Sequence, residues 1–366
     1  MQVPESSDGR TGARHDTERG VGRRLHPDAL WLVLLLFIGG VLLSGCTNGF
    51  AQSGLVLASW NLEHLAAADG AGCRARTEAD YAALRKVAAT LRADVIAVQE
   101  VENAAALARV FDPAVYDVVL SGRAEKVRGN CRGSAGPRRT PQHTGFVIHR
   151  ERLSAQGLGW RVLPPFRDIG VEGRRWGARI RIEPLASGQG GNGLELMSLH
   201  LKSGCAWGRL DARNVRRGQC LILRRQRGIL EQWIDERAAA DAPFVLIGDF
   251  NRQLDQPHDD FWNAIDDGEV CVWREDRLLG RACRRGTAVR DRDADLMLAN
   301  AGVPFAYPYN PKYPYAVDHF VFSGGASAWV VGNSYRALGY DGDPPPSDHH
   351  PIRILVRLPW ADQPQN

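Results

Sequence analysis

Nine short apolar segments most constrain what this chain can fold into. Several alternate apolar and polar residues with a period of two, which is typical of β-strands. The segments are Leu55–Trp60, Asp94–Val98, Val115–Leu120, Gly145–His149, Ala178–Ile182, Leu194–His200, Phe244–Gly248, Val317–Phe322 and Ile352–Leu358. Helical patterns cover Tyr81–Leu91 and a long stretch within Leu221–Ala240. Without an internal repeat or a long linker, this pattern predicts one α/β domain, residues 54–360, in which helices cover two packed sheets.

The composition fits a globular protein but does not identify its partner. The 366 residues are 44% hydrophobic and 24% charged, enough for a sizeable core, which excludes disorder of the whole chain. The formal net charge of +4 is too small to argue for nucleic acid on its own. Of the basic residues, 42 are Arg and 4 are Lys, a skew that we attribute to codon bias. Arginine counts therefore carry little weight.

The first 45 residues are typical of an export signal. Arg23 and Arg24 precede an apolar run, Ala29–Leu43, that is short for a membrane span, which needs about 20 residues. The sequence that follows, Leu-Ser-Gly-Cys46, resembles a bacterial lipobox. We predict a lipoprotein signal peptide with a long basic leader (1–45), a tether (46–53) from lipidated Cys46, and a C-terminal tail (361–366). A plain signal peptide or an uncleaved anchor is the alternative.

Six further cysteines fit an exported protein. They are Cys73, Cys131, Cys205, Cys220, Cys271 and Cys283, an even number that favours disulfides in an oxidising compartment. Local loop closure suggests the pairs Cys205–Cys220 and Cys271–Cys283, which leaves Cys73 with Cys131. Free thiols remain an alternative, and the absence of a CxxC pair disfavours zinc.

Polar side chains stand at the ends of the predicted strands. The motifs are "SWNLEHL", "AVQEVEN", "SLHLKSG", "IGDFNR", "VDHFVF" and "PSDHHPI". They contribute Asn61, Glu63, Gln99, Glu100, His200, Lys202, Asp249, Asn251, Asp318, Asp348, His349 and His350. If the strands lie side by side, these groups meet at one rim. Taken singly, an Asn could close a turn and His200 could be a core residue.

The residue types at that rim favour hydrolysis at phosphorus. Carboxylates and amides are hard oxygen ligands, which favour Mg²⁺, Mn²⁺ or Ca²⁺ over zinc. These ligands are Glu63, Glu100, Asp249, Asp348, Asn61 and Asn251. Crowded carboxylates repel one another unless a cation or a proton neutralises them. His349, with Asp318 available to hold its ring, could act as a general base or acid.

In their order along the chain, these motifs resemble the endonuclease/exonuclease/phosphatase superfamily, over roughly Leu55 to Leu358. The family includes secreted deoxyribonucleases, abasic-site endonucleases, neutral sphingomyelinases and inositol polyphosphate phosphatases. The resemblance implies a four-layer α/β sandwich with two packed, largely antiparallel mixed β-sheets flanked by helices. It also implies that the metal lies at one edge of the paired sheets.

The same resemblance implies roles for individual residues. Glu100 would be the main metal ligand, with Asn61, Glu63 and Asp348 nearby. Asp249 and Asn251 would orient the nucleophile and the phosphate, His349 and Asp318 would form the catalytic pair, and His200 could protonate the leaving group. Whether Asp249 or His349 takes the proton from water stays open. Glu63 stands where many members have Asp, and His319 follows Asp318 where Tyr is frequent.

The substrate is less constrained than the chemistry. The segment Ser121–His143 carries six basic residues and one acid, and either lines a phosphate groove or is a solvated loop. Lys202, Tyr309 and Lys312 are the predicted substrate contacts, because aromatics beside a Lys can stack bases or rest at a lipid interface. We expect a monomeric nuclease without a protein partner, periplasmic or anchored in the outer membrane. A phospholipid phosphodiesterase, a small-molecule phosphatase and a non-catalytic binding protein are the alternatives.

Overall fold

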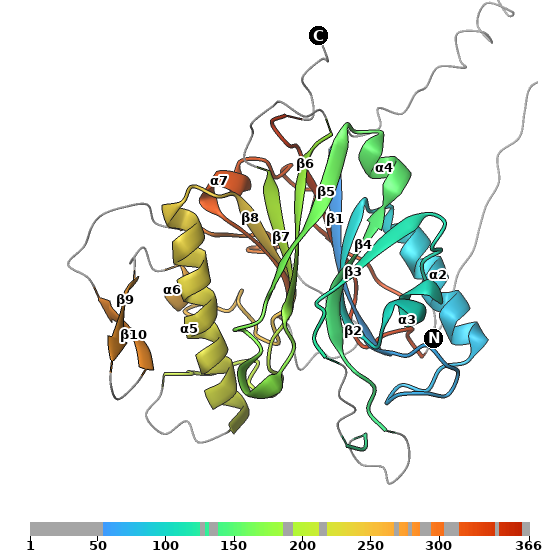
Figure 1. The fold of residues 1–366 in the computed structure, drawn as a ribbon, viewed down its shortest axis with the longest axis horizontal. Coiled ribbons are helices and arrows are strands. Elements are labelled where there is room, and N and C mark those ends of the chain that lie inside the picture. Colours follow the sequence, from blue (N-terminus) through green and yellow to red (C-terminus); the bar gives the residue numbers. More distant parts are fainter. Residues whose placement is uncertain are drawn as a thin grey trace, which may run out of the picture. The chain divides into compact units, whose positions relative to one another are not determined.

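Two six-stranded mixed sheets lie face to face in the computed structural model (Figure 1). The structure describes residues 54–124, 129–131, 138–185, 193–211, 218–266, 294–303, 315–340 and 344–360, and the backbone alone of 271–276 and 280–285. All of these residues fall within one compact unit, Ser53–Asn366. Among them, no helix combines the length and the apolar character needed to cross a membrane.

Each sheet is antiparallel except for one parallel pair at its centre. The first sheet has the order β13 (Arg336–Ala337), β14 (Ile352–Val356), β1 (Leu55–Leu65), β2 (Val95–Val101), β4 (His143–His149), β3 (Tyr116–Leu120). The second has the order β11 (Met297–Leu298), β12 (Asp318–Phe322), β8 (Phe244–Asp249), β7 (Leu194–His200), β6 (Gly177–Pro184), β5 (Leu158–Phe166). The parallel pairs are β1 with β2 and β7 with β8. A separate hairpin pairs β9 (Cys271–Asp276) with β10 (Gly280–Arg285).

Helices cover the outer face of each sheet, which makes four layers. α5 (Gly218–Ala239), at the left of Figure 1, packs Leu223 and Leu230 against the second sheet, and α6 (Trp262–Ile265) contributes Ile265 to the same cluster. α2 (Glu78–Leu91), at the right, packs Tyr81 and Leu84 against the first sheet beside α3 (Ala104–Ala108). Three short elements lie in connections: α4 (Arg150–Ser154), η1 (Val171–Gly173) and α7 (Gly324–Ser327).

Side-chain alternation divides the apolar residues into three layers. In β1, Leu55 and Leu57 face the second sheet, while Ala58 and Trp60 face α2. The period of two therefore supplies both the core between the sheets and the core under the helices. The predicted four-layer α/β sandwich is confirmed.

All nine predicted strands and both predicted helices are present, with ends shifted by a few residues. The sequence analysis missed β5, β9, β10, β11 and β13. The longest of these is β5, whose sequence LGWRVLPPF contains two prolines. Proline cannot donate to a ladder and is tolerated mainly on edge strands. β5 is an edge strand, so its prolines are compatible with pairing on one side.

Gly248 stands where β8 meets β7 most closely, and we expect Gly248→Ala to destabilise the fold. Its φ is +137°, and an added Cβ would lie 2.2 Å from the carbonyl oxygen of Leu199. Because that neighbour is backbone, the clash cannot be relieved by a rotamer change. Thermal unfolding should report a loss of roughly 3 kcal/mol or more. Gly70→Ala is the control, since Gly70 has φ +71° but nothing within 4 Å of its added Cβ. Equal losses in the two variants would contradict the steric argument.

Candidate active site

The carboxyl ends of the four central strands meet at one edge of the sandwich. In the second sheet, Asp249 pairs in register with His200 of β7 and with Asp318 of β12. Across the gap to the first sheet, Nδ2 of Asn61 donates to Oδ2 of Asp249 at 3.1 Å. Parallel strands end at the same edge of a sheet, and here two such pairs face each other. This is why residues far apart in the sequence converge.

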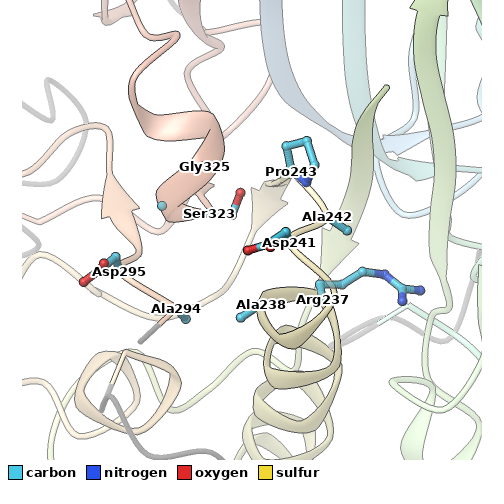
Figure 2. Close-up of a pocket in the computed structure, with 10 residues that line it drawn as sticks. Arg237, Ala238, Asp241, Ala242, Pro243, Ala294, Asp295, Ser323 and Gly325 are labelled. Atoms are coloured by element: carbon cyan, nitrogen blue, oxygen red, sulfur yellow. The ribbon is translucent and has the colours of Figure 1, made fainter. Parts of the chain in front are cut away.

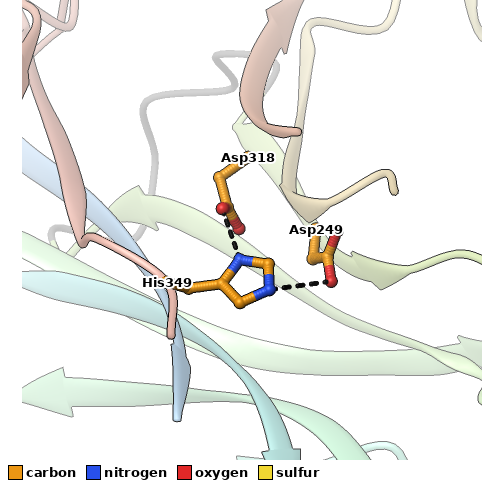
Figure 3. Close-up of side chains that lie close together, drawn as sticks. All are labelled: Asp249, Asp318 and His349. Atoms are coloured by element: carbon orange, nitrogen blue, oxygen red, sulfur yellow. Dashed lines mark hydrogen bonds and ion pairs between the residues drawn. The ribbon is translucent and has the colours of Figure 1, made fainter. Parts of the chain in front are cut away.

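His349 lies between two carboxylates, as Figure 3 shows. Its Nδ1 donates to Oδ2 of Asp318 at 2.6 Å, and its Nε2 is 3.8 Å from Oδ2 of Asp249. Burial disfavours the charged imidazole, but the two aspartates outweigh it and hold the pKa of His349 well above its ordinary value. The predicted pairing of His349 with Asp318 is therefore present in the structure. The ring is oriented for proton transfer at Nε2.

Asp249 is buried and held by three nitrogen donors. The Nδ2 atoms of Asn61 and Asn251 donate to its Oδ2, and the backbone N–H of Asn251 donates to its Oδ1 at 2.7 Å. Burial, with Asp318 nearby, raises the pKa of Asp249 to about 7 despite the opposing effect of His349. A carboxyl group with a pKa near neutrality is suited to general acid–base work.

His200 is buried between the two sheets. Its Nε2 lies 3.3 Å from Oδ2 of Asp249 and 3.5 Å from Oε1 of Glu100, and its Nδ1 has no hydrogen-bond partner among the described atoms. Burial, with Arg175 beside it, holds the pKa of His200 well below its ordinary value. His200 is therefore a neutral imidazole in contact with two acidic side chains of the site.

Strained backbone marks the same edge. Glu63, His64, Glu100 and Asn251 all have φ between +42° and +60°, a region that non-glycine residues rarely occupy. The β1–β2 and β2–β4 ladders shift register at these positions. Bulges and left-handed residues re-aim side chains and are concentrated at functional sites. Here they coincide with two of the predicted metal ligands, Glu63 and Glu100.

Three carboxylates gather beside this bulge. The backbone N–H of His64 donates to Oε2 of Glu100 at 3.1 Å, and that of Asp348 donates to Oε2 of Glu63 at 3.1 Å. Burial and the charge of Asp348 raise the pKa of Glu63, which is partly offset by Arg74, 3.6 Å away. Repelling oxygen donors of this kind are suited to a hard divalent cation. The chemistry of the donor set thus fits the metal that the sequence predicts.

A second grouping of possible ligands lies next to it. Among the described residues, donor atoms of Asp249, Asp318 and His349 lie within 4.8 Å of one another. However, Asp318 and His349 already bond to each other, and Asp249 already accepts three hydrogen bonds. We therefore interpret these three as the proton-transfer group rather than as the metal ligands.

Several supporting residues were missed by the sequence analysis. Buried Arg76 donates to the carbonyl oxygens of Leu62, Glu63 and Pro346, which ties the Glu63 bulge to the Ser347–His349 segment. Ser347 donates to the carbonyl oxygen of Asn61 at 2.7 Å. Arginine is too frequent in this chain for Arg76 to have stood out. Only its burial reveals it.

Arg175 is a second missed residue. It donates to the carbonyl oxygens of His200 and Leu201 and interacts electrostatically with Glu100 and Asp249. Burial lowers its pKa to about 10 in spite of those two acids. Lys202, a predicted substrate contact, lies beside it at the end of β7. Tyr309 and Lys312, the other predicted contacts, and Cys46 lie outside the described residues.

Two of the three expected disulfides are confirmed. Cys73 bonds to Cys131, and Cys205 bonds to Cys220. The side chains of Cys271 and Cys283 lie outside the described part of the chain. The first disulfide fastens the segment around Cys131 beside the Glu63 bulge, and the second closes the loop that follows β7.

A hollow of about 290 Å³ lies at the opposite edge of the second sheet (Figure 2). It is lined by residues such as Arg237, Pro243 and Ser323. Pro243 immediately precedes β8, whereas Asp249 ends it, so the length of the strand separates this hollow from the carboxylates and histidines described above. It has no part in the chemistry of that site.

The sandwich and its rim of carboxylates, amides and paired histidine define a hydrolase of phosphoester bonds. The chain belongs to the Endonuclease/Exonuclease/phosphatase family, whose model matches residues 58–349. The family resemblance found in the sequence is confirmed. No protein among the curated sequences compared with this chain matches it.

Solved structures share the fold at low sequence identity. A humanized TDP2 of D. rerio carrying 14 mutations is 15% identical, with a TM-score of 0.50, and the match covers 84% of this chain and 100% of that one. The AP endonuclease LMAP from Leishmania major is 18% identical, with a TM-score of 0.49, over 85% of this chain and 90% of that one. The first similarity supports the α/β-sandwich architecture and does not extend to a substrate.

The raised pKa of Asp249 predicts that Asp249→Asn stabilises the fold while it impairs catalysis. In the unfolded chain this carboxyl ionises near pH ~3.9, but in the fold it ionises at about 7. Ionisation therefore lowers stability as the pH rises through that interval. We expect the variant to melt roughly 2–6 °C higher than the wild type near pH 8. The gain should vanish at pH values below ~3.9, where the carboxyl is neutral in both the folded and the unfolded chain. A gain that did not depend on pH would rule out this cause.

Proposed function

We propose that this protein is a divalent-metal-dependent phosphodiesterase that acts on nucleic acid at the cell envelope. The observation that carries the proposal is the second histidine of the site. His200 lies within 3.5 Å of both Asp249 and Glu100, opposite the Asp318–His349 pair. A phosphodiester hydrolase must take a proton from water and deliver one to the leaving alkoxide. Neutral His200, in contact with the Asp249 carboxyl whose pKa is about 7, can relay a proton to the leaving group.

The attacking water gives its proton to the Asp249–His349 pair. These two groups lie 3.8 Å apart, and each shifts the pKa of the other, so we assign the proton to the pair rather than to either residue. Asp318 holds the imidazole through Nδ1 and stabilises its charged form. The Nδ2 of Asn251 is positioned beside Asp249 and can orient a phosphate oxygen next to the water.

Glu100, with Glu63, Asp348 and the amide oxygen of Asn61, would hold the divalent cation. When bound, such a cation neutralises charge on the phosphate oxygens as the leaving group departs. Mg²⁺ is the expected ion, with Mn²⁺ or Ca²⁺ as alternatives, because all the donors are oxygens. Arg76 maintains this site through the backbone of Glu63, and His64 maintains it through the contacts of its N–H and ring with Glu100.

We expect Mg²⁺- or Mn²⁺-dependent cleavage of plasmid DNA or RNA by the purified domain, and its complete loss in EDTA. His349→Ala should reduce the rate about 10²- to 10⁴-fold, because it removes a proton-transfer group of the site. A gel assay of supercoiled plasmid measures both effects. The matched control is His258→Ala, which removes an exposed histidine outside the site.

A substrate panel separates this proposal from its alternatives. Release of choline phosphate from sphingomyelin, or of inorganic phosphate from monoesters, without cleavage of DNA or RNA would identify a lipid or small-molecule hydrolase. Full activity of both Asp249→Ala and His349→Ala on every substrate would indicate a binding protein instead.

The proposed location rests on the N-terminal sequence alone. If Cys46 carries lipid, the protein made in a bacterial host should partition with membranes and incorporate labelled palmitate. Cys46→Ala should abolish the labelling and release the protein from the membrane fraction. Membrane association that survives the substitution would favour an uncleaved anchor.

A further inference from the structure

The arginines of this chain differ in whether an acid accompanies them. Several described arginines are ion-paired with acids at the surface: Arg109 with Asp69, Arg150 with Asp117, Arg161 with Glu183 and Arg227 with Asp211. Such pairs need no ligand. Arg353 also has no ion pair with a described acid, but it bonds to the carbonyl oxygen of Leu91. At the catalytic edge, three cations without such a pair lie near one another. No described carboxylate forms an ion pair with Arg139, Arg174 or Lys202, which we name the cationic rim.

Hydrogen bonds place the three members of the cationic rim on one side of the site. Arg175 binds the carbonyl oxygens of His200 and Leu201, which brings its neighbour Arg174 beside Lys202. Arg123 donates to the carbonyl oxygens of Gly173 and Gln142, and so joins the loop of Arg174 to the segment of Arg139. The rim therefore lies beside the end of β7.

The segment that carries Arg139 is fastened rather than free. Its backbone N–H donates to the carbonyl oxygen of Gly129 at 3.1 Å, Arg138 pairs with Asn130, and the next residue, Cys131, bonds to Cys73. The Nε atoms of Arg139 and Arg174 have no hydrogen-bond partner among the described atoms, which is also true of ion-paired Arg227. What sets the rim apart is that the backbone holds its cations in place, which prepares them for an anionic ligand.

The rim also carries an electrostatic cost. Burial, followed by Arg174, Arg175 and Arg139, lowers the pKa of Lys202 to about 8. Like charges that repel one another in the folded protein are relieved when an anion binds among them. The acids of the catalytic site, Glu100 and Asp249, face Arg175 instead. The phosphate at the scissile position and an anion at the rim would therefore occupy different places.

We propose that the cationic rim is a second phosphate subsite, which binds a neighbouring phosphate of a polynucleotide while the scissile phosphate lies at His349 and Asp249. This inference rests on the proposed phosphodiesterase function and deepens it. It assigns the substrate class, because a polynucleotide presents regularly spaced phosphates, whereas sphingomyelin or another single phosphodiester presents one.

Binding without catalysis tests the rim directly. Fluorescence anisotropy of a short fluorescein-labelled oligothymidylate is measured in EDTA, so the result does not depend on hydrolysis. We expect Arg174→Gln and Lys202→Gln each to weaken binding about tenfold and to reduce the slope of log affinity against log salt by about 0.7. The matched controls Arg161→Gln and Lys86→Gln remove an ion-paired and an exposed charge elsewhere and should match the wild type.

A comparison of two substrates extends the test to turnover. Selectivity for the oligothymidylate over bis(4-nitrophenyl) phosphate, which has one phosphate, should fall about tenfold in the rim variants, chiefly through KM. Thermal unfolding and circular dichroism check that each variant is folded. If Arg174→Gln does not fold, Arg139→Gln replaces it in the comparison.

Three results would overturn the proposal. They are the absence of oligothymidylate binding by the wild type, rim variants that bind like the controls, and phosphatidylglycerol vesicle binding that depends on the rim as strongly as oligothymidylate binding does. Failure of the proposed hydrolysis is distinguishable, because it would abolish turnover of both substrates and leave rim-dependent binding in EDTA intact. Conversely, hydrolysis that is unchanged in the rim variants would support the phosphodiesterase proposal but contradict the second phosphate subsite.

Discussion

The hydrogen bond from Asn61 to Asp249 joins the ends of the two sheets, and the site depends on it. It is supported one layer deeper by Gln99, whose Nε2 donates to Ser198 at 3.2 Å across the same gap. Buried polar contacts between sheets are costly unless each partner is satisfied, so they fix one relative position of the sheets. That position places Glu100 of the first sheet beside His200 of the second.

More acidic side chains meet at the strand ends than would be stable without compensating positive charges. Asp249 and Asp318 lie in register on adjacent strands, and Glu63 faces Asp348. The protein offsets part of this repulsion with His349, Arg74 and Arg175. Burial, together with the repulsion that remains, raises the pKa values of Asp249 and Glu63. A site that holds charges in place before its ligands bind is preorganised for catalysis, and the fold is less stable as a result. The strained backbone of Glu63, Glu100 and Asn251 is a second form of the same cost.

The arginines of this chain differ in whether each one has an acidic partner, and this says more about binding than their number does. With 42 arginines in the sequence, composition and local clusters are poor guides to binding. In the fold, Arg76 becomes a buried link between the Glu63 bulge and Pro346, and Arg175 fixes the end of β7. Arg139 and Arg174 remain without an acidic partner among the described residues. Such differences arise from neighbours that are remote in sequence.

The amino-acid sequence by itself determined nine of the strands and the polar residues at their ends. Period-two alternation identifies a strand because side chains must point to opposite faces, and Asn61, Glu100, Asp249 and His349 follow or precede such runs. Pattern predicted two packed sheets covered by helices, and the family resemblance implied the four layers. Local loop closure suggested Cys205–Cys220, and Cys73–Cys131 was the pair that remained.

Only the tertiary structure decided which of those residues are in contact and which have shifted pKa values. The 2.6 Å bond of His349 to Asp318, the burial of His200 and the left-handed turn at Glu100 depend on how two sheets pack. β5 was missed because its prolines are acceptable only at a sheet edge, a position that exists once the sheet has formed. Local pattern is a property of neighbours along the chain, whereas burial and charge coupling are properties of neighbours in space.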